Sequence, residues 1–314
     1  MYSSLPRFLL RRVLTGVVVL WGAVTVTFFA VSAAGGDQVD AILGPQAANL
    51  PGLRAQVAAE YGLDHPLPMQ YLDRLASLAT GDFGRSYQRN EPVTRLLASQ
   101  ILPTLELALS AAVIGLLLAL VATVITSGRG RIVRTGTSVF EVLAVAIPPF
   151  WLGILLLSIF SFNLRWFPAF GSHGVSGLVL PTLALAIPIS GVLAQVMRQE
   201  LELVEGRPFV LSARARGQSR LGLLLRHTLR HALLPATTMS AWVLGTLVGG
   251  AVLVEKVFSR PGLGTVLVNA VQHRDTPVVS AVVIMAALIF VVANTLADTL
   301  YPVIDARLRE ASRA

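Results

Sequence analysis

Residue types that carry catalytic or metal chemistry are scarce in this chain of 314 residues. The sequence contains no cysteine, which excludes thiolate metal sites and cysteine nucleophiles. Lys256 is the only lysine and is followed by Val257, so the phosphate-binding motif G-x-x-x-x-G-K-[ST] cannot occur. If ATP drives this protein, the ATPase is therefore a separate subunit.

Two histidines have a spacing that is typical of zinc ligands. His227 and His231 are four residues apart and would share one helix face. The residues between them include Arg230 but no glutamate, so the general base of H-E-x-x-H is absent and a cation lies beside the would-be metal. We predict no metal site and interpret the pair as solvated or in contact with lipid headgroups.

One serine lies in a short motif that resembles a protease signature. The string G-V-S-G at 174–177 is similar to the G-x-S-G motif of six-span intramembrane serine proteases. Those enzymes need a histidine on a later span to activate the serine. The last apolar run contains no histidine, and His273 precedes it, so a protease remains only an alternative.

Four carboxylates lie at the ends of apolar runs: Glu106, Glu141, Glu255 and Asp298. Ionisable groups within a membrane are costly and are candidates for function. At the end of a run, however, a side chain reaches headgroups or a neighbouring helix. No carboxylate lies in the middle of a run, which makes a proton-coupled secondary transporter the weaker alternative.

An unusually apolar chain must position these few groups. The sequence is 54% hydrophobic and 13% charged, whereas an ordinary soluble domain has about 25% charged residues. We predict an all-α polytopic integral membrane protein, because the apolar residues fall into uncharged runs long enough to cross a bilayer. Six transmembrane helices are predicted, at 13–34, 107–128, 142–164, 174–197, 232–254 and 276–297. The third and fourth contain prolines that we expect to kink or loosen them: Pro148, Pro149, Pro181 and Pro188.

The formal charge of +8 indicates membrane orientation rather than nucleic-acid binding. With six spans, both termini and two connections lie on one side, where arginines gather at 7–12, 129–134, 198–230 and 307–313. The short loops of the other side carry few basic residues. We therefore predict cytoplasmic N- and C-termini in a bacterial cell membrane, with contacts to anionic lipid.

The predicted spans divide the chain into three parts. Residues 1–34 form the cytoplasmic N-terminus and first transmembrane helix, and 35–100 an extracytoplasmic loop region with short helices. Residues 101–314 form a core domain with five transmembrane helices, including a cytoplasmic loop at 198–231. In that loop Pro208 is a typical helix start, Gly217 a helix break and Ser219 a cap.

Six motifs are distributed along nearly the whole chain: Y-G-L-D-H-P-L at 61–67, G-D-F-G-R-S at 81–86, P-T-L-E-L-A at 103–108, F-V-L-S-A-R-A-R-G at 209–217, E-K-V-F-S-R-P-G-L-G at 255–264 and R-D-T-P-V at 274–278. Together they resemble one family, the permease subunit of dipeptide and oligopeptide ABC importers, whose group includes nickel and glutathione permeases. The chain departs from the family pattern at Phe209 for tyrosine, Arg216 for lysine and Ala306 for proline.

The resemblance implies a type I ABC importer fold and a set of partners. These are a homologous second permease subunit, two ATP-binding domains on one or two chains, an extracytoplasmic substrate-binding protein and membrane lipid, with no nucleic acid. It implies no catalytic residue and no cofactor in this chain, because ATP and magnesium belong to the partner ATPase subunits. The substrate implied is a dipeptide or oligopeptide, with nickel or glutathione as alternatives.

The family's coupling loop, which docks on the ATPase, matches the cytoplasmic segment. A short helix from about Pro208 to Arg216, ended by Gly217, would form a rigid knob with Phe209, Val210 and Ala213 to bury in a partner's groove. An amphipathic helix on the membrane surface is the alternative. The resemblance assigns coupling to Arg207, Pro208, Phe209, Val210, Ala213, Arg214, Ala215, Arg216, Gly217 and Arg220.

A second set of matched residues lies in the predicted extracytoplasmic segments. The resemblance implies that these residues dock the binding protein or shape the outer face. They are Asp64, Gly81, Asp82, Gly84, Pro261, Gly262, Gly264, Arg274 and Asp275.

Overall fold

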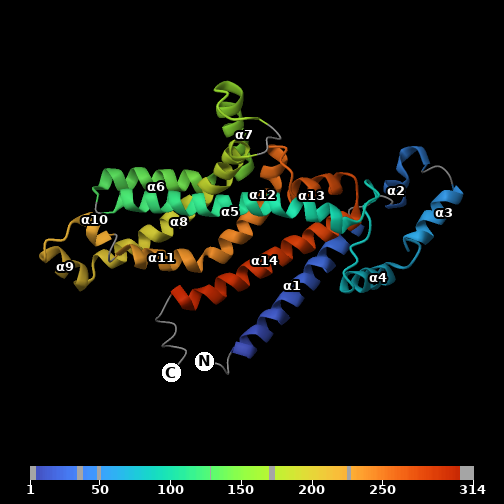
Figure 1. The fold of residues 1–314 in the computed structure, drawn as a ribbon, viewed down its shortest axis with the longest axis horizontal. Helices are drawn as coiled ribbons and strands as arrows, with labels where there is room; N and C mark the ends of the chain where they lie inside the picture. The colour runs from blue at the N-terminus through green and yellow to red at the C-terminus, as the bar shows by residue number, and fades with distance from the viewer. Residues whose placement is uncertain are drawn as a thin grey trace. The chain divides into compact units, whose positions relative to one another are not determined.

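The structure is a computed structural model that describes residues 5–33, 38–47, 51–127, 129–169, 174–224 and 228–304. Helices account for nearly all of its regular structure, and the described part contains no strand beyond one isolated bridge between Arg85 and Pro92. The helices, drawn in Figure 1, are α1 (Leu5–Ala33), α2 (Gln38–Ala47), α3 (Pro51–Glu60), α4 (Leu67–Ala79), α5 (Val93–Thr126), α6 (Arg131–Ala146), α7 (Pro149–Leu156), the π-helix η1 (Leu157–Asn163), α8 (Val175–Glu205), α9 (Pro208–Ala215), α10 (Arg220–Leu223), α11 (Leu229–Thr238), α12 (Ser240–Val257), α13 (Leu263–Gln272) and α14 (Thr276–Ile304). The prediction of an all-α fold is confirmed.

Four described helices are long and apolar enough to cross a membrane: α1, α5, α8 and α14. A fifth candidate is the pair formed by α6 and the segment 149–163, which is bent by 103° at the break between them. The six predicted spans agree with this pattern, although the count of six is not reproduced exactly. The fifth predicted span is divided between α11 and α12, which meet at Met239.

Prolines explain the largest difference from the predicted spans. A single span at 142–164 was expected to be kinked, but the structure places a sharp break within it, at Ile147 and Pro148. A proline disfavours the helical conformation for the residue that precedes it. Ile147 accordingly has an extended backbone, with ψ of 121°. Pro181 and Pro188 behave differently, because α8 continues through both of them.

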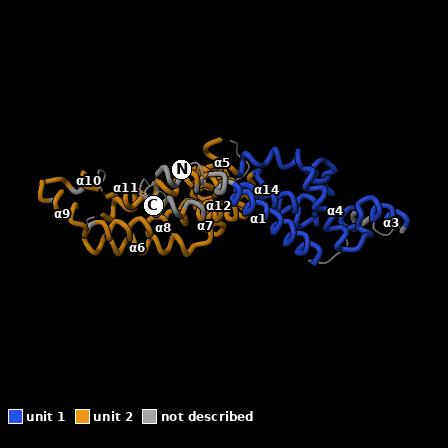
Figure 2. Tube along the Cα trace, turned by 90° about the horizontal axis from the view of Figure 1, so that it is seen from below, with its two compact units in different colours: residues 1–104, 261–291 blue, residues 105–260, 292–314 orange. Residues whose placement is uncertain are grey.

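The chain divides into two compact units, shown in blue and orange in Figure 2. Unit 1 comprises residues 1–104 and 261–291, and unit 2 comprises 105–260 and 292–314. The two units are defined by contacts between residues and not by the side of the membrane on which a segment lies. The predicted division of the chain at residues 34 and 100 therefore stays a prediction.

Unit 1 has a core built by the first turns of α5, by α13 and by the first half of α14. Val93, Leu97, Ala281 and Val282 are among its most buried members. The three short helices α2, α3 and α4 lie within 35–100, where short helices were expected.

Unit 2 is organised around α8, which contacts α6, α7, α11 and α12. Small side chains along α8 allow this, since Ala184, Ala186 and Ala194 are almost fully buried. Gly191 marks the closest approach, because a β-carbon there would lie 2.8 Å from the carbonyl oxygen of Glu141 on α6.

We predict that Gly191→Ala destabilises the protein although alanine is the better helix former. The added methyl group would also meet Val145 Cγ2 at 3.0 Å, so α6 must move. Such overpacking costs about 1–3 kcal/mol, more than the gain of about 1 kcal/mol from helix propensity.

The measurement is the thermal midpoint of the detergent-solubilised protein. Gly136→Ala on α6 is the matched control, because nothing lies within 4 Å of its β-carbon position. A midpoint for Gly191→Ala equal to or above that of the control would contradict the close contact.

Candidate functional sites

The first candidate site is the segment that follows α8. This helix ends at Glu205, eight residues past the predicted span end at Met197. Pro208 begins α9, where its missing N–H costs no hydrogen bond and its fixed φ suits the first turn. Gly217 follows α9 with a left-handed φ of 78°, and Gln218 N donates to Ala213 O at 3.3 Å. The predicted short helix, ended by this glycine, is confirmed.

The next turn is capped as predicted. Ser219 Oγ accepts a hydrogen bond from Gly222 N at 3.2 Å, at the start of α10. A serine at this position satisfies one of the free N–H groups of a helix start. The short α10 packs back against α9.

Burial within α9 corrects the expected docking surface. Val210 and Ala213 were expected to enter a partner's groove, but both are buried inside this chain with Val204 and Leu223. The reason is the helical period: residues 210 and 213 share the face that turns back toward α8 and α10. The large exposed apolar side chains of α9 are Phe209 and Leu211.

The other predicted coupling residues lie around these two side chains. Arg207, Pro208, Ala215, Arg216 and Gly217 are exposed. The side chains of Arg214 and Arg220 lie outside the described residues. Phe209 lies with its ring centroid 5.9 Å from that of His231 on α11. Exposed arginines around two apolar side chains suit a protein interface with a polar rim.

The second candidate site, in unit 1, is built around Asp275. This carboxylate is buried and accepts hydrogen bonds from Ser86 Oγ at 2.5 Å, Tyr87 N at 3.2 Å and Gln88 N at 3.4 Å. The structure thus joins the matched motif at 81–86 to the one at 274–278. Asp275 stabilises the fold of the segment that contains Ser86, and its burial leaves it unavailable to an external partner.

A helix-ending turn places the predicted Gly81 and Asp82. Gly81 has a left-handed φ of 80°, and Asp82 N donates to Ser77 O at 2.9 Å, which closes α4 as a Schellman motif. Asp82 Oδ1 then accepts from Gly84 N at 2.8 Å. Gly84 also has a positive φ, of 76°. These residues shape a turn that glycine favours at both positions.

The remaining predicted outer residues are not gathered into one site. Asp64, Pro261 and Arg274 are exposed, whereas Gly262 and Gly264 are buried at the start of α13. Leu263 N, between these glycines, donates to Thr104 Oγ1 at 2.9 Å.

Sequence reasoning missed Arg74 and Tyr87 in this region. Arg74 donates to Phe83 O and to Pro277 O, each at 3.4 Å. Burial lowers the pKa of Arg74 and raises the pKa of Tyr87 to about 12, although the nearby Arg74 charge opposes the latter shift. The partners of Arg74 are up to 203 residues away, so no local pattern signals its role.

Glu106 and Glu141 each reach a neighbouring element, as expected for carboxylates at the ends of apolar runs. Glu106 Oε2 accepts from Arg260 Nη2 at 2.6 Å, and Glu141 Oε2 accepts from Arg198 Nη2 at 2.9 Å. Glu255 is fully buried, and the side chain of Asp298 lies outside the described residues. No group of three or more potential metal ligands occurs among the described residues.

Comparison with known proteins defines the class of this membrane-spanning chain. Residues 111–310 match the family described as "Binding-protein-dependent transport system inner membrane component", and residues 5–108 match the N-terminal family of such membrane components. The chain belongs to this family of membrane transport subunits. The ATP-hydrolysing site of such ABC transporters lies in partner subunits, so this chain is a permease rather than an enzyme.

Individual relatives match over nearly their whole length. The chain is 32% identical to an oligopeptide transport system permease protein of Bacillus subtilis, over 96% of this chain and 98% of that protein. It is 34% identical to a glutathione transport system permease protein of Salmonella typhimurium, with the same coverage. A crystal structure of an amino acid ABC transporter shares the fold, with a TM-score of 0.51 and 16% identity over 66% of this chain and 94% of that one.

We predict that Asp275→Asn destabilises unit 1. The amide would turn an N–H₂ group toward one of three donors, which leaves buried polar groups unpaired at a cost of about 1–3 kcal/mol each. The measurement is protease resistance of residues 80–90 in the purified protein. Asp73→Asn is the control, because its side chain is 60% exposed. Equal resistance of the two variants would refute a structural role for Asp275.

Proposed function

We propose that this chain is the permease subunit of an ATP-driven importer for dipeptides or oligopeptides. The observation that carries the proposal is the similarity, over 96% of the chain, to an oligopeptide permease. Glutathione is an alternative substrate, because a glutathione permease is equally similar. Since glutathione is itself a tripeptide, both relatives favour a pathway for short peptides. Nickel is the third alternative, because nickel permeases belong to the group of permeases that this sequence resembles.

The proposed partners follow from this class. A homologous second permease would complete the pathway, and an extracytoplasmic binding protein would deliver the substrate. Two ATP-binding domains, on one or two chains, would hold ATP and magnesium, with no cofactor bound by this chain. The termini and the 198–231 segment would face the cytoplasm, as the arginine distribution indicates.

Alternating access is the proposed mechanism. Closure of the ATP-binding domains would displace α9, whose exposed Phe209 and Leu211 are the apolar contacts available to them. Val210 packs with Val204 in the last turns of α8, so a displacement of α9 is passed directly to that helix. Because α8 contacts four other helices of unit 2, its movement would rearrange the pathway.

The exposed members of the predicted outer set are the proposed contacts for a binding protein. They are Asp64, Gly81, Asp82, Pro261 and Arg274. Gly262, Gly264 and Asp275 would act indirectly by holding the backbone near these contacts.

We predict that Phe209→Ala reduces ATP-driven uptake at least about tenfold while the amount of protein in the membrane is unchanged. Truncation of a central aromatic side chain in an interface commonly costs about 2 kcal/mol or more. Phe140→Ala is the matched control, because Phe140 is an exposed phenylalanine on α6 and is not part of the coupling segment. Uptake and ATPase activity are measured in proteoliposomes that contain the complete transporter. Normal coupling in Phe209→Ala would contradict the proposed contact.

A substrate test uses the transporter purified with its companions from native membranes. We expect ATP-dependent uptake of a radiolabelled dipeptide or tripeptide that excess unlabelled peptide abolishes, while nickel has no effect. Uptake driven by an ion gradient without ATP, or competition by nickel alone, would contradict the peptide importer. Stoichiometric recovery of a second permease and ATPase subunits serves as the control for an intact complex.

A further inference from the structure

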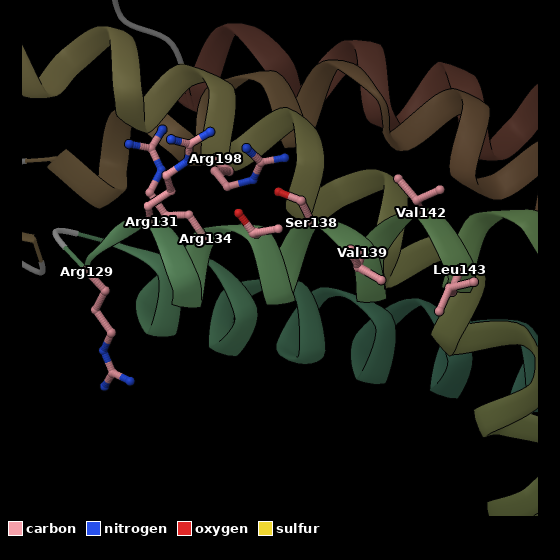
Figure 3. A pocket seen from close by; sticks show the side chains of 9 residues that line it. Arg129, Arg131, Arg134, Ser138, Val139, Val142, Leu143 and Arg198 are labelled. Carbon is pink, nitrogen blue, oxygen red and sulfur yellow. The ribbon is translucent and has the colours of Figure 1, made fainter.

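An open pocket of about 690 Å³ lies in unit 2 at the start of α6. Figure 3 shows the side chains of Arg131 and Arg134, from α6, and of Arg198, from α8, gathered at one end of it, with Ser138 beside them. Arg129 also lines the pocket but points to the other side of the helix start. Three guanidinium groups around a hydroxyl are a typical setting for a phosphate group.

Carboxylates neutralise only part of this charge. Arg198 is bound by Glu141 at 2.9 Å, and Glu202 accepts from both Arg134 at 2.5 Å and Arg198 at 3.4 Å. Among the described residues Arg131 forms no ion pair and the Ser138 hydroxyl makes no hydrogen bond. The pocket therefore has a surplus positive charge and a free donor group.

The start of α6 adds to the surplus. Gly130 precedes the helix and supplies no side-chain cap, and the first turn contains no acidic residue. A helix N-terminus carries a partial positive charge. Arginines at this end are repelled by that charge, which makes their electrostatic energy less favourable. An anion at this end would accept from the free N–H groups and offset the arginine charge.

The other end of the pocket is apolar. Val139, Val142 and Leu143 line it, and all three side chains are exposed. From Arg131 to Leu143 the helix rises about 18 Å at 1.5 Å per residue, the scale of a headgroup with the first part of an acyl chain. Figure 3 shows this order along α6, with arginines at one end and aliphatic side chains at the other.

We propose that this pocket binds one acidic glycerophospholipid. Its phosphate lies among Arg131, Arg134 and Ser138, and its acyl chain lies along Val139 and Leu143. Basic pockets beside membrane-spanning helices commonly hold anionic headgroups, and α6 belongs to a candidate broken span. The apolar end favours lipid over free phosphate, which would leave Val139, Val142 and Leu143 without a partner. The inference does not depend on which solute is transported.

The test uses the complete transporter in nanodiscs with photoactivatable phosphatidylglycerol, which carries a diazirine near the start of its acyl chain. A phosphatidylcholine probe with the same chain is the neutral comparison. Mass spectrometry then quantifies labelling of residues 138–143. We expect phosphatidylglycerol to label this segment about fivefold more than phosphatidylcholine, the factor that corresponds to one arginine near an anionic surface.

Two variants test the positive charge of the pocket and its open volume separately. Arg131→Gln should remove most of the preference for phosphatidylglycerol, and Ser138→Trp should lower labelling by filling the pocket while keeping every arginine. Arg165→Gln is the matched control, because Arg165 is an exposed arginine in the loop after η1. Normal ATPase activity verifies that each variant is folded.

Three results would overturn the proposal. The first is equal labelling by the two lipid probes. The second is displacement of the probe by inorganic phosphate at constant ionic strength, which would indicate a free-anion site. The third is absence of lipid labelling together with cross-linking of Ser138→Cys to another subunit, which would identify the pocket as a protein interface. Because the chain has no cysteine, that introduced thiol is the chain's only one.

Discussion

The contact between α6 and α8 is the constraint on which unit 2 depends. In a bilayer, apolar side chains gain little from leaving lipid for one another, so close backbone approach and polar contacts hold helices together. Gly191 supplies the close approach, and the Glu141–Arg198 pair supplies the polar contact. A buried carboxylate without its cation would be strongly unfavourable, so the pair also restricts how α6 can slide along α8. The same contact positions Arg198 at the edge of the basic pocket.

The buried part of α9 links this framework to the coupling segment. Val210 and Ala213 were expected to be part of a docking knob, but they pack against the end of α8 and against α10. The helix is therefore attached to the core on one face and offers a small apolar surface on the other. Such an arrangement is suited to transmitting displacement, because a loosely attached helix would move without moving α8.

Unit 1 is held by polar contacts between segments far apart in the sequence. Asp275 binds the Ser86 hydroxyl and the backbone N–H groups of 87 and 88, and Arg74 bridges Phe83 to Pro277. Polar contacts are effective here because they are buried: a carboxylate that accepts three hydrogen bonds in the interior cannot be replaced by water without opening the fold. The matched motifs at 81–86 and 274–278 are therefore a structural unit.

The sequence by itself determined the all-helical membrane class, the short helix after Pro208, its end at Gly217 and the absence of a Walker-type lysine. These depend on composition, helix length and local backbone preference, which are readable within a few residues. The break at Pro148 was foreseen as a kink, but the size of its bend was not, because neighbouring helices decide how far a proline opens the chain. Only the tertiary structure decided that Val210 and Ala213 face inward, that Ser86 reaches Asp275 across 189 residues, and that arginines from two helices meet at one pocket. The physical reason is that apolar residues facing lipid and apolar residues facing protein look alike in sequence, so the faces that meet are set by small residues and distant polar partners.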